Sequence, residues 1–511
     1  MFKDGLAHRS IDNGGCLEKL YLASISLLVL TACSGGGGGG STSTAPTTTT
    51  PTANTAPNVS NQITDQSGNV GYAFEFDASQ NGATFNDADG DTLTYSVAFA
   101  PANRGLVATN EKISGTPNAP GDITITVTAT DPSGASASDT FILSVGIDQN
   151  AVQAEFNGSI DLESLLNYEG QTAPGYITEI NDDGNPITDA GATLGRVLFY
   201  DTSLSTDGTV SCASCHDQSH GFSDPGVVST GVEGGQTRRH SMRLINTRFA
   251  QERGFFWDER ADSHEEQETM PLRDHNEMGF SGQNGRPDFD DLLAQMEATE
   301  YYEELFRFAF LSPDITEERI QDALAQFVKS IWSFDSRFDE GRAQVNNNGA
   351  NFPNYTAAEN AGKTLFLDRP NQGGAGCAAC HRPPEFDIAP NSDMNGVFAE
   401  AGSLTTFDLT NTRSPSLRDL VAPDGTPNGP FMHDGSLATL RDVIDHYDDI
   451  TEPQSEPPLS DWRNAIDNRL FPNGNPQRLN LTETEKQQLE AFLRTLTGVS
   501  IYTDIRFSDP F

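Results

Sequence analysis

Two short stretches decide the fold of this chain: VSCASCHDQSHGF at residues 210–222 and GAGCAACHRPPEF at residues 374–386. Each contains the motif Cys-x-x-Cys-His, in which both cysteines attach covalently to a haem and the histidine ligates its iron. The residues concerned are Cys212, Cys215, His216, Cys377, Cys380 and His381. The sequence therefore predicts two covalently bound c-type haems, with His216 and His381 as proximal ligands.

Two other uses of paired cysteines are disfavoured. A zinc site would need four thiolates from both pairs, but the pairs lie far apart and a histidine directly follows each one. A redox-active disulfide would be expected within a thioredoxin-like βαβ pattern, which surrounds neither pair. Haem attachment remains the favoured interpretation.

The sequence around the two motifs is mainly helical in pattern. Apolar residues recur at helical spacing in two stretches, and the second begins with a capping box, Thr482-x-x-Glu485. The apolar positions are Ile320, Leu324, Phe327, Val328 and Ile331 in the first stretch and Leu489, Phe492, Leu493 and Leu496 in the second. We predict two mainly α-helical cytochrome c-type haem domains, over residues 188–345 and 350–500.

A different pattern precedes them, at residues 57–147. Apolar and polar residues alternate, for example over 93–99, 123–130 and 141–145, which indicates half-buried antiparallel strands. The region resembles bacterial cadherin-like, Ig-like repeats, and we predict a small β-sandwich that acts as a spacer or adhesion module. Four of its carboxylates are either Ca²⁺ ligands or turn-forming residues, and the sequence leaves both open: Asp87, Asp89, Asp91 and Asp131.

The N-terminal residues resemble an export signal. An apolar run over 20–30 is too short to cross a bilayer and ends at the lipobox-like sequence Leu30-Thr31-Ala32-Cys33. We predict a lipoprotein signal peptide at 1–33 with Cys33 as the lipidation site, although an ordinary cleaved signal is the alternative. A Gly/Thr/Pro-rich linker follows at 34–56. The predicted location is the cell envelope, with the protein lipid-anchored and facing the periplasm or the outer membrane.

The charge of the chain restricts its partners. Asp and Glu number 73 against 31 Lys and Arg, a formal net charge of −42. Such a chain repels phosphate backbones, so we expect no nucleic-acid partner. A basic protein partner would be attracted by this negative charge. We also consider a homodimer possible. The six cysteines exclude a disulfide-dense scaffold.

From about residue 190 to 500 the chain resembles the bacterial di-haem cytochrome c peroxidases, which include the MauG-like enzymes. The blocks that carry the resemblance are LGRVLFYDTSLSTDGTVSCASCHDQSHGFSD, FFWDERA, EEQETMPLRDHNEMGF, GCAACHRPPEFD, SPSLRDL and GPFMHDGSLATLRDVIDHYD. The resemblance implies an oxidoreductase that reduces hydrogen peroxide. The electrons would come from a small redox protein or, as in MauG-like enzymes, from side chains of a partner protein.

The resemblance also implies roles for single residues. Trp257 would relay electrons between the haems, and Glu277 would move protons while the peroxide is cleaved. Gln267 would donate a hydrogen bond in the same distal pocket, and Pro271 would form part of its wall. A calcium ion between the haem domains would take ligands from Asn246 and from the backbone oxygens of Asn428 and Pro430.

The second ligand of the C-terminal haem separates two branches of the family. Tyr447 occupies the position at which many members carry methionine, and the resemblance implies that tyrosine there is MauG-like. A phenolate donor stabilises oxidised iron, whereas a thioether favours Fe(II). His446 is the competitor, and adjacent helical residues point about 100° apart, so only one of the two can face the iron. For the N-terminal haem, His220 is an alternative distal ligand.

Two other functions compete with the peroxidase. A lipid-anchored di-haem electron-transfer cytochrome would keep both irons six-coordinate and unreactive towards peroxide. An adhesin with vestigial haems would depend on the β module alone. The distal-pocket residues favour the enzyme, because a pure carrier has no use for Glu277.

Overall fold

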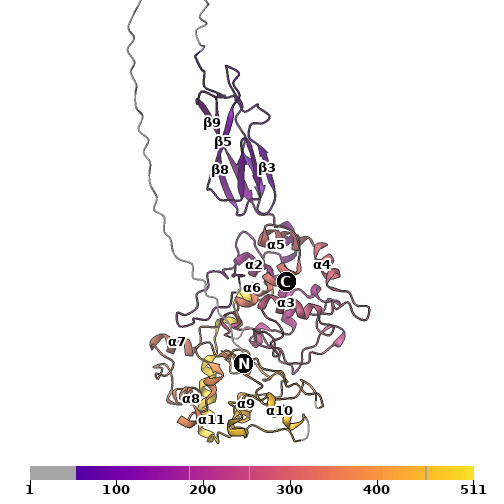
Figure 1. Cartoon of the computed structure of the whole chain (residues 1–511), viewed down its shortest axis with the longest axis vertical. Helices are drawn as coiled ribbons and strands as arrows, with labels where there is room; N and C mark the ends of the chain where they lie inside the picture. The colour runs from indigo at the N-terminus through magenta and orange to yellow at the C-terminus, as the bar shows by residue number, and fades with distance from the viewer. Residues whose placement is uncertain (1–52, 183, 252–253, 404, 455–456) are drawn as a thin grey trace, which may run out of the picture. The chain divides into compact units, whose positions relative to one another are not determined.

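Two sheets form the N-terminal part of the described chain. The computed structural model describes residues 53–511 except 183, 252–253, 404 and 455–456. The strands are β1 (Asn58–Val59), β2 (Gln66–Asn69), β3 (Phe74–Asp77), β4 (Phe85–Asn86), β5 (Thr94–Ala100), β6 (Leu106–Thr109), β7 (Lys112–Gly115), β8 (Gly121–Thr130) and β9 (Ser136–Gly146). One sheet has the order β2-β9-β8-β5 and the other β3-β7-β6, and β1 and β4 form a separate two-stranded ladder. Figure 1 labels β9, β8 and β5 of the first sheet and β3 of the second.

Apolar and polar residues alternate along the two longest strands, β8 and β9, so that each strand has one buried face and one exposed face. Ile123, Ile125 and Val127 of β8 are completely buried, and the threonines between them face outward. On the outer face Thr126 and Thr128 hydrogen-bond to side chains of β9. The predicted β-rich, Ig-like region is therefore confirmed. The stretches predicted as antiparallel strands, now β5, β8 and β9, do pair antiparallel. The structure adds β2, which the sequence analysis did not assign and which pairs with β9 in parallel.

Helices and long loops make up the rest. In the first half they are α1 (Asn150–Phe156), α2 (Asp189–Tyr200), α3 (His264–Arg273), α4 (Phe289–Glu297), α5 (Glu300–Phe310), α6 (Glu317–Lys329) and α7 (Arg337–Gln344). In the second half they are α8 (Ala357–Leu367), α9 (Leu440–Asp448), α10 (Leu459–Ala465) and α11 (Glu483–Leu493), with a short ladder of β10 (His381–Arg382) and β11 (Asp387–Ile388). Among the described residues, no helix combines the length and the apolar character needed to cross a bilayer.

Each half is built around a pair of helices in close contact. A Cβ atom at Gly195 of α2 would lie 2.0 Å from the carbonyl oxygen of Ala323 in α6. In the second half a Cβ at Gly362 of α8 would lie 1.8 Å from the oxygen of Gln488 in α11. Only glycine permits such an approach. In both halves the first helix of the pair precedes the Cys-x-x-Cys-His motif, so the same packing supports both haem sites.

The predicted helical stripes lie in these partner helices. Ile320, Leu324 and Phe327 of α6 are fully buried in the core of the first half. Helix α6 ends at Lys329, so Ile331 continues the same core beyond the helix, and Leu496 does so after α11 in the second half. The core of the first half also takes in Val152, Phe156, Ile160, Leu162, Tyr168, Ile501 and Phe507, which lie outside the predicted range 188–345.

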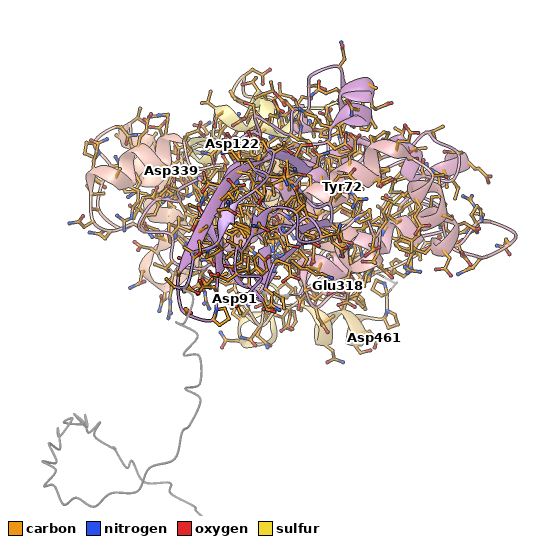
Figure 2. The ribbon with its side chains drawn as sticks, turned by 90° about the horizontal axis from the view of Figure 1, so that it is seen from above. Tyr72, Asp91, Asp122, Glu318, Asp339 and Asp461 are labelled. Carbon is orange, nitrogen blue, oxygen red and sulfur yellow. The ribbon has the colours of Figure 1, made fainter. Side chains whose placement is uncertain are left out.

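A buried ion pair joins the two halves. Arg418 is 0% exposed, and its guanidinium binds both carboxylate oxygens of Asp339 at 2.9 and 3.0 Å. Asp339, labelled in Figure 2, also accepts a hydrogen bond from Tyr176. Arg418 further donates to the backbone oxygens of Ser333 and Pro384, and thereby ties three loops to α7.

We expect Asp339→Asn to lower the free energy of unfolding by about 3–5 kcal/mol, because it leaves the guanidinium of Arg418 buried without its counter-charge. Denaturant unfolding monitored by far-UV circular dichroism measures this loss. Asp449→Asn is the matched control, since Asp449 pairs with Arg478 at the surface, where an ion pair contributes about 0–1 kcal/mol. Equal losses in the two variants would contradict the account.

Candidate haem sites

A cavity of about 730 Å³ lies in the second half, and Cys377, Cys380 and His381 form part of its wall. Most of its surface is apolar, and contributions from α8, α9 and α11 include Phe366, Ile444 and Leu489. This size and lining are those of a cofactor pocket. Both thiols and the imidazole border one cavity, as covalent attachment and iron ligation require, so the residues present fit a c-type haem.

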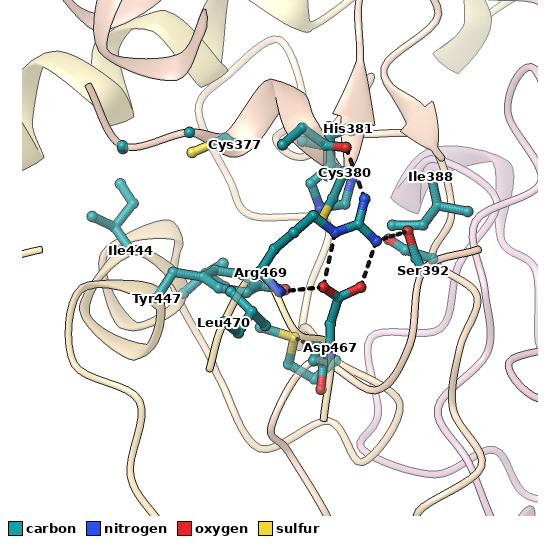
Figure 3. A pocket seen from close by; sticks show the side chains of 18 of the residues that line it. Cys377, Cys380, His381, Ile388, Ser392, Ile444, Tyr447, Asp467, Arg469 and Leu470 are labelled. Carbon is teal, nitrogen blue, oxygen red and sulfur yellow. Dashed lines mark hydrogen bonds and ion pairs between the residues drawn. The ribbon is translucent and has the colours of Figure 1, made fainter. Parts of the chain in front are cut away.

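Tyr447 borders the same cavity, and His446 does not. Figure 3 shows Tyr447 and His381 on different walls of it. The ring of His446 turns away, and its Nε2 lies 3.0 Å from the backbone oxygen of Asn395. Burial and the neighbouring Cys380 and Cys377 raise the pKa of the Tyr447 hydroxyl, in the protein without haem. Helix α9 thus presents to the cavity the residue that the resemblance implied.

An arginine clamp holds the attachment loop of this site. Arg469 pairs with Asp467 and donates to the backbone oxygen of Ala379, between the two cysteines, at 2.9 Å. It also donates to Ser392 at 3.0 Å (Figure 3). Burial and the positive charge of Arg469 lower the pKa of His381 to about 4, which keeps its imidazole neutral and available as a ligand.

The proximal histidine of the first half is oriented by the backbone. His216 Nδ1 lies 3.1 Å from the carbonyl oxygen of Phe222. Because a carbonyl only accepts, Nδ1 carries the hydrogen and Nε2 is left for iron. Burial lowers the pKa of His216. Cys212 begins a short 3₁₀ turn, Cys212–Ser214, and Cys215 directly follows the turn. This arrangement fits the first c-type haem.

Two half-buried carboxyl groups lie near these thiols. Burial raises the pKa of Cys212 and of Cys215; Glu268 and Glu277 add to the shift of Cys212, and Glu277 adds to that of Cys215. Burial, with Asp274 nearby, raises the pKa of Glu277 to about 7. Burial and Glu265 raise the pKa of Glu268 to about 8. Both groups therefore exchange protons near neutral pH, which suits proton transfer.

Sequence reasoning missed Glu268. It directly follows Gln267 on α3, and the only available signal was an acid beside a predicted pocket residue on a chain rich in acids. Gln267 is half-buried on the same helix, and Pro271 lies within its last turn. The roles of Gln267 and Pro271 in a distal pocket stay predictions.

Trp257 lies where the two halves meet. Its side chain is buried and borders the C-terminal cavity, and its Nε1 donates to the backbone oxygen of His240 at 2.7 Å. Its own backbone oxygen accepts from the amides of Thr412 and Arg413, at 2.9 and 3.0 Å. The ring centroid is 6.2 Å from that of His433. Trp257 is thus held rigidly beside the second haem site by residues of both halves.

The residues predicted to bind calcium differ in their surroundings. Asn246 exchanges two hydrogen bonds with the backbone of Ser333, at 3.1 and 2.9 Å, so its side chain already has a partner. Asn428 Oδ1 is buried and has no hydrogen-bond partner among the described residues. Pro430 borders the C-terminal cavity. Calcium therefore stays a prediction.

His220 was the alternative distal ligand of the N-terminal haem. Its Nε2 lies 2.6 Å from the backbone oxygen of Gly429, so this nitrogen is engaged by the backbone.

In the β module, ligand oxygens of Asp87, Asp91 and Asp131 lie within 4.8 Å of one another. Asp89 is not in this group, and its carboxylate accepts from the amide of Thr55. Ca²⁺ binding here also stays a prediction. Cys33 lies outside the described residues.

Comparison with known proteins agrees with these sites. A family model described as di-haem cytochrome c peroxidase matches residues 189–347, and one for an Ig domain matches residues 56–146. The methylamine utilization protein MauG of Methylophilus methylotrophus is 31% identical over 61% of this chain and 84% of its own length. The cytochrome c551 peroxidase of Nitrosomonas europaea is 28% identical over 60% of this chain and 80% of its own.

A solved structure shows the same fold. It is that of a MauG-like protein associated with microbial copper homeostasis, with 30% sequence identity and a TM-score of 0.50. The match covers 67% of this chain and 99% of that one.

Proposed function

The chain belongs to the di-haem cytochrome c peroxidase family. From this premise we propose that its two haem sites have different roles, as in the MauG-like enzymes. The family makes it an oxidoreductase with two covalently bound c-type haems. When bound, the haems supply redox-active iron that accepts electrons from a donor and delivers them to peroxide. We assign peroxide to the N-terminal site and electron entry to the C-terminal site.

One observation carries the MauG-like assignment: Tyr447 borders the cavity that Cys377, Cys380 and His381 line. His446 is engaged by the backbone oxygen of Asn395 instead. We therefore propose that His381 and Tyr447 would both hold the iron of the C-terminal haem. A phenolate favours oxidised iron, so the fully oxidised protein would be ready for peroxide without prior reduction.

At the N-terminal site we propose Glu277 as the group that moves protons. Its carboxylate takes a proton from hydrogen peroxide and returns it to the departing hydroxide, so that water leaves. Two electrons and two protons convert one hydrogen peroxide into two waters. Gln267 would orient the peroxide from α3.

The pH dependence tests this assignment. Burial raises the pKa of Glu277 to about 7 because it disfavours the carboxylate. Below that pH the group is protonated and cannot accept the peroxide proton, so the second-order rate constant should rise with pH up to about 7 and then level off. Stopped-flow absorbance measures the rate constant. A profile that is flat or falls through this range would contradict the role of Glu277.

Trp257 is our proposed relay between the two sites, because it is buried beside the second one and joined to both halves by hydrogen bonds. The electron source is a protein partner. With a net charge of −42, the chain would attract a basic partner by long-range electrostatics. We propose that the protein works in the cell envelope, tethered by lipid at Cys33.

A further inference from the structure

A buried arginine in the C-terminal cavity lacks a counter-ion. Arg243 borders the cavity, and only 7% of the residue is exposed. Its Nη2 donates to the backbone oxygen of Ser416 at 3.2 Å, and its Nε has no hydrogen-bond partner among the described residues. In the part of the chain that the structure describes, no carboxylate lies within salt-bridge distance of it.

Such a charge is costly to bury. Removing a guanidinium from water without pairing it opposes folding by an amount comparable with the whole stability of a domain. Burial lowers the pKa of Arg243 to about 10, and the electrostatic effects of Tyr502 and Asp419 offset this only in part. Arg418, also fully buried, binds both carboxylate oxygens of Asp339. Arg243 therefore differs from Arg418 in lacking the anion that a buried guanidinium needs.

The position of Arg243 indicates which anion fits. The wall of the cavity carries the two thiols and the proximal histidine, and Arg243 contributes a cation to it. A haem carries two propionate carboxylates, and a guanidinium binds a carboxylate through two parallel hydrogen bonds. A propionate would supply the acceptor that Nε lacks and would neutralise the charge.

We propose that Arg243 binds a propionate of the C-terminal haem and, by neutralising its charge, raises the Fe(III)/Fe(II) potential of that haem. An uncompensated carboxylate near the iron stabilises Fe(III), so pairing it with a cation shifts the potential upward. Arg243 is then a positioning residue of the electron-entry site. The inference rests on the haem assignment of the proposed function, and not on the reaction with peroxide.

The test is a spectroscopic redox titration of the two-haem protein and of Arg243→Gln. We expect the potential of the C-terminal haem to fall in the variant and that of the N-terminal haem to stay constant. Arg196→Gln is the matched control, because Arg196 is 2% exposed, lies on α2 and donates to the backbone oxygen of Ser508. It should destabilise the protein without moving either potential.

Arg243→Lys keeps the charge and covers the case in which Arg243→Gln fails to accumulate with haem. Its C-terminal potential should stay near that of the unaltered protein, while the resonance Raman band of propionate bending should shift, because lysine replaces a two-point contact. An unchanged potential in Arg243→Gln, or an unchanged propionate band in Arg243→Lys, would overturn the inference. If these shifts are present but the unaltered protein does not react with peroxide, the proposed function is overturned and the inference on Arg243 stands.

Discussion

Replacing Glu277 with glutamine should slow the reaction with hydrogen peroxide by about 10²–10⁴-fold, the usual contribution of a positioned acid–base group. Glutamine preserves the shape of the side chain but cannot take a proton from the peroxide. The measurement is the second-order rate constant from stopped-flow absorbance of the Soret band. The haem spectra before mixing should stay the same, since Glu277 is not an iron ligand in our account.

Glu268→Gln is the matched control. Glu268 is also a half-buried carboxyl whose pKa is raised, and it too lies near Cys212. If the loss in Glu277→Gln reflects proton transfer, the rate in Glu268→Gln should fall far less. Equal losses in the two variants would show that any carboxyl near the first site matters only through its charge, and Glu277 would lose its special role.

Replacing Tyr447 with phenylalanine should remove one axial ligand from the C-terminal haem. The side chain keeps its ring and most of its packing but loses the oxygen that would bind the iron. Electron paramagnetic resonance of the oxidised protein should show a low-spin haem converted into a high-spin one. We also expect the reaction with peroxide to require prior reduction, because the phenolate no longer stabilises the oxidised state.

His446→Gln distinguishes the two candidate ligands. Glutamine can still donate to the backbone oxygen of Asn395, which His446 Nε2 contacts at 3.0 Å. This variant should therefore keep the low-spin signal. If His446→Gln loses that signal and Tyr447→Phe keeps it, histidine is the ligand and the MauG-like assignment is wrong.

Much of the fold could be predicted from sequence because its signals are local. Alternating apolar residues indicated β8 and β9, the capping box at Thr482 placed the start of α11, and the Cys-x-x-Cys-His motifs placed both haems. The parallel pairing of β2 with β9 could not be predicted, because strand direction depends on contacts between residues far apart in sequence. The return of Ile501 and Phe507 to the first core has the same cause.

The site was predictable where a motif extended over several residues. Trp257, Glu277 and Tyr447 were predicted from such blocks, and their roles stay predictions. The structure adds that Tyr447 borders the cavity and His446 does not. Glu268 and Arg243 carry no such signal. Each is an ordinary charged residue in the sequence, and only the folded chain shows that Glu268 is a half-buried acid near Cys212 and that Arg243 borders the cavity.

The most direct test mixes the fully oxidised two-haem protein with one equivalent of hydrogen peroxide and follows the Soret band by stopped flow. The account predicts a rapid spectral change without prior reduction, in proportion to the peroxide added. A change that occurs only after one-electron reduction would contradict the Tyr447 ligand. No reaction in either state would contradict the peroxidase and leave an electron-transfer protein.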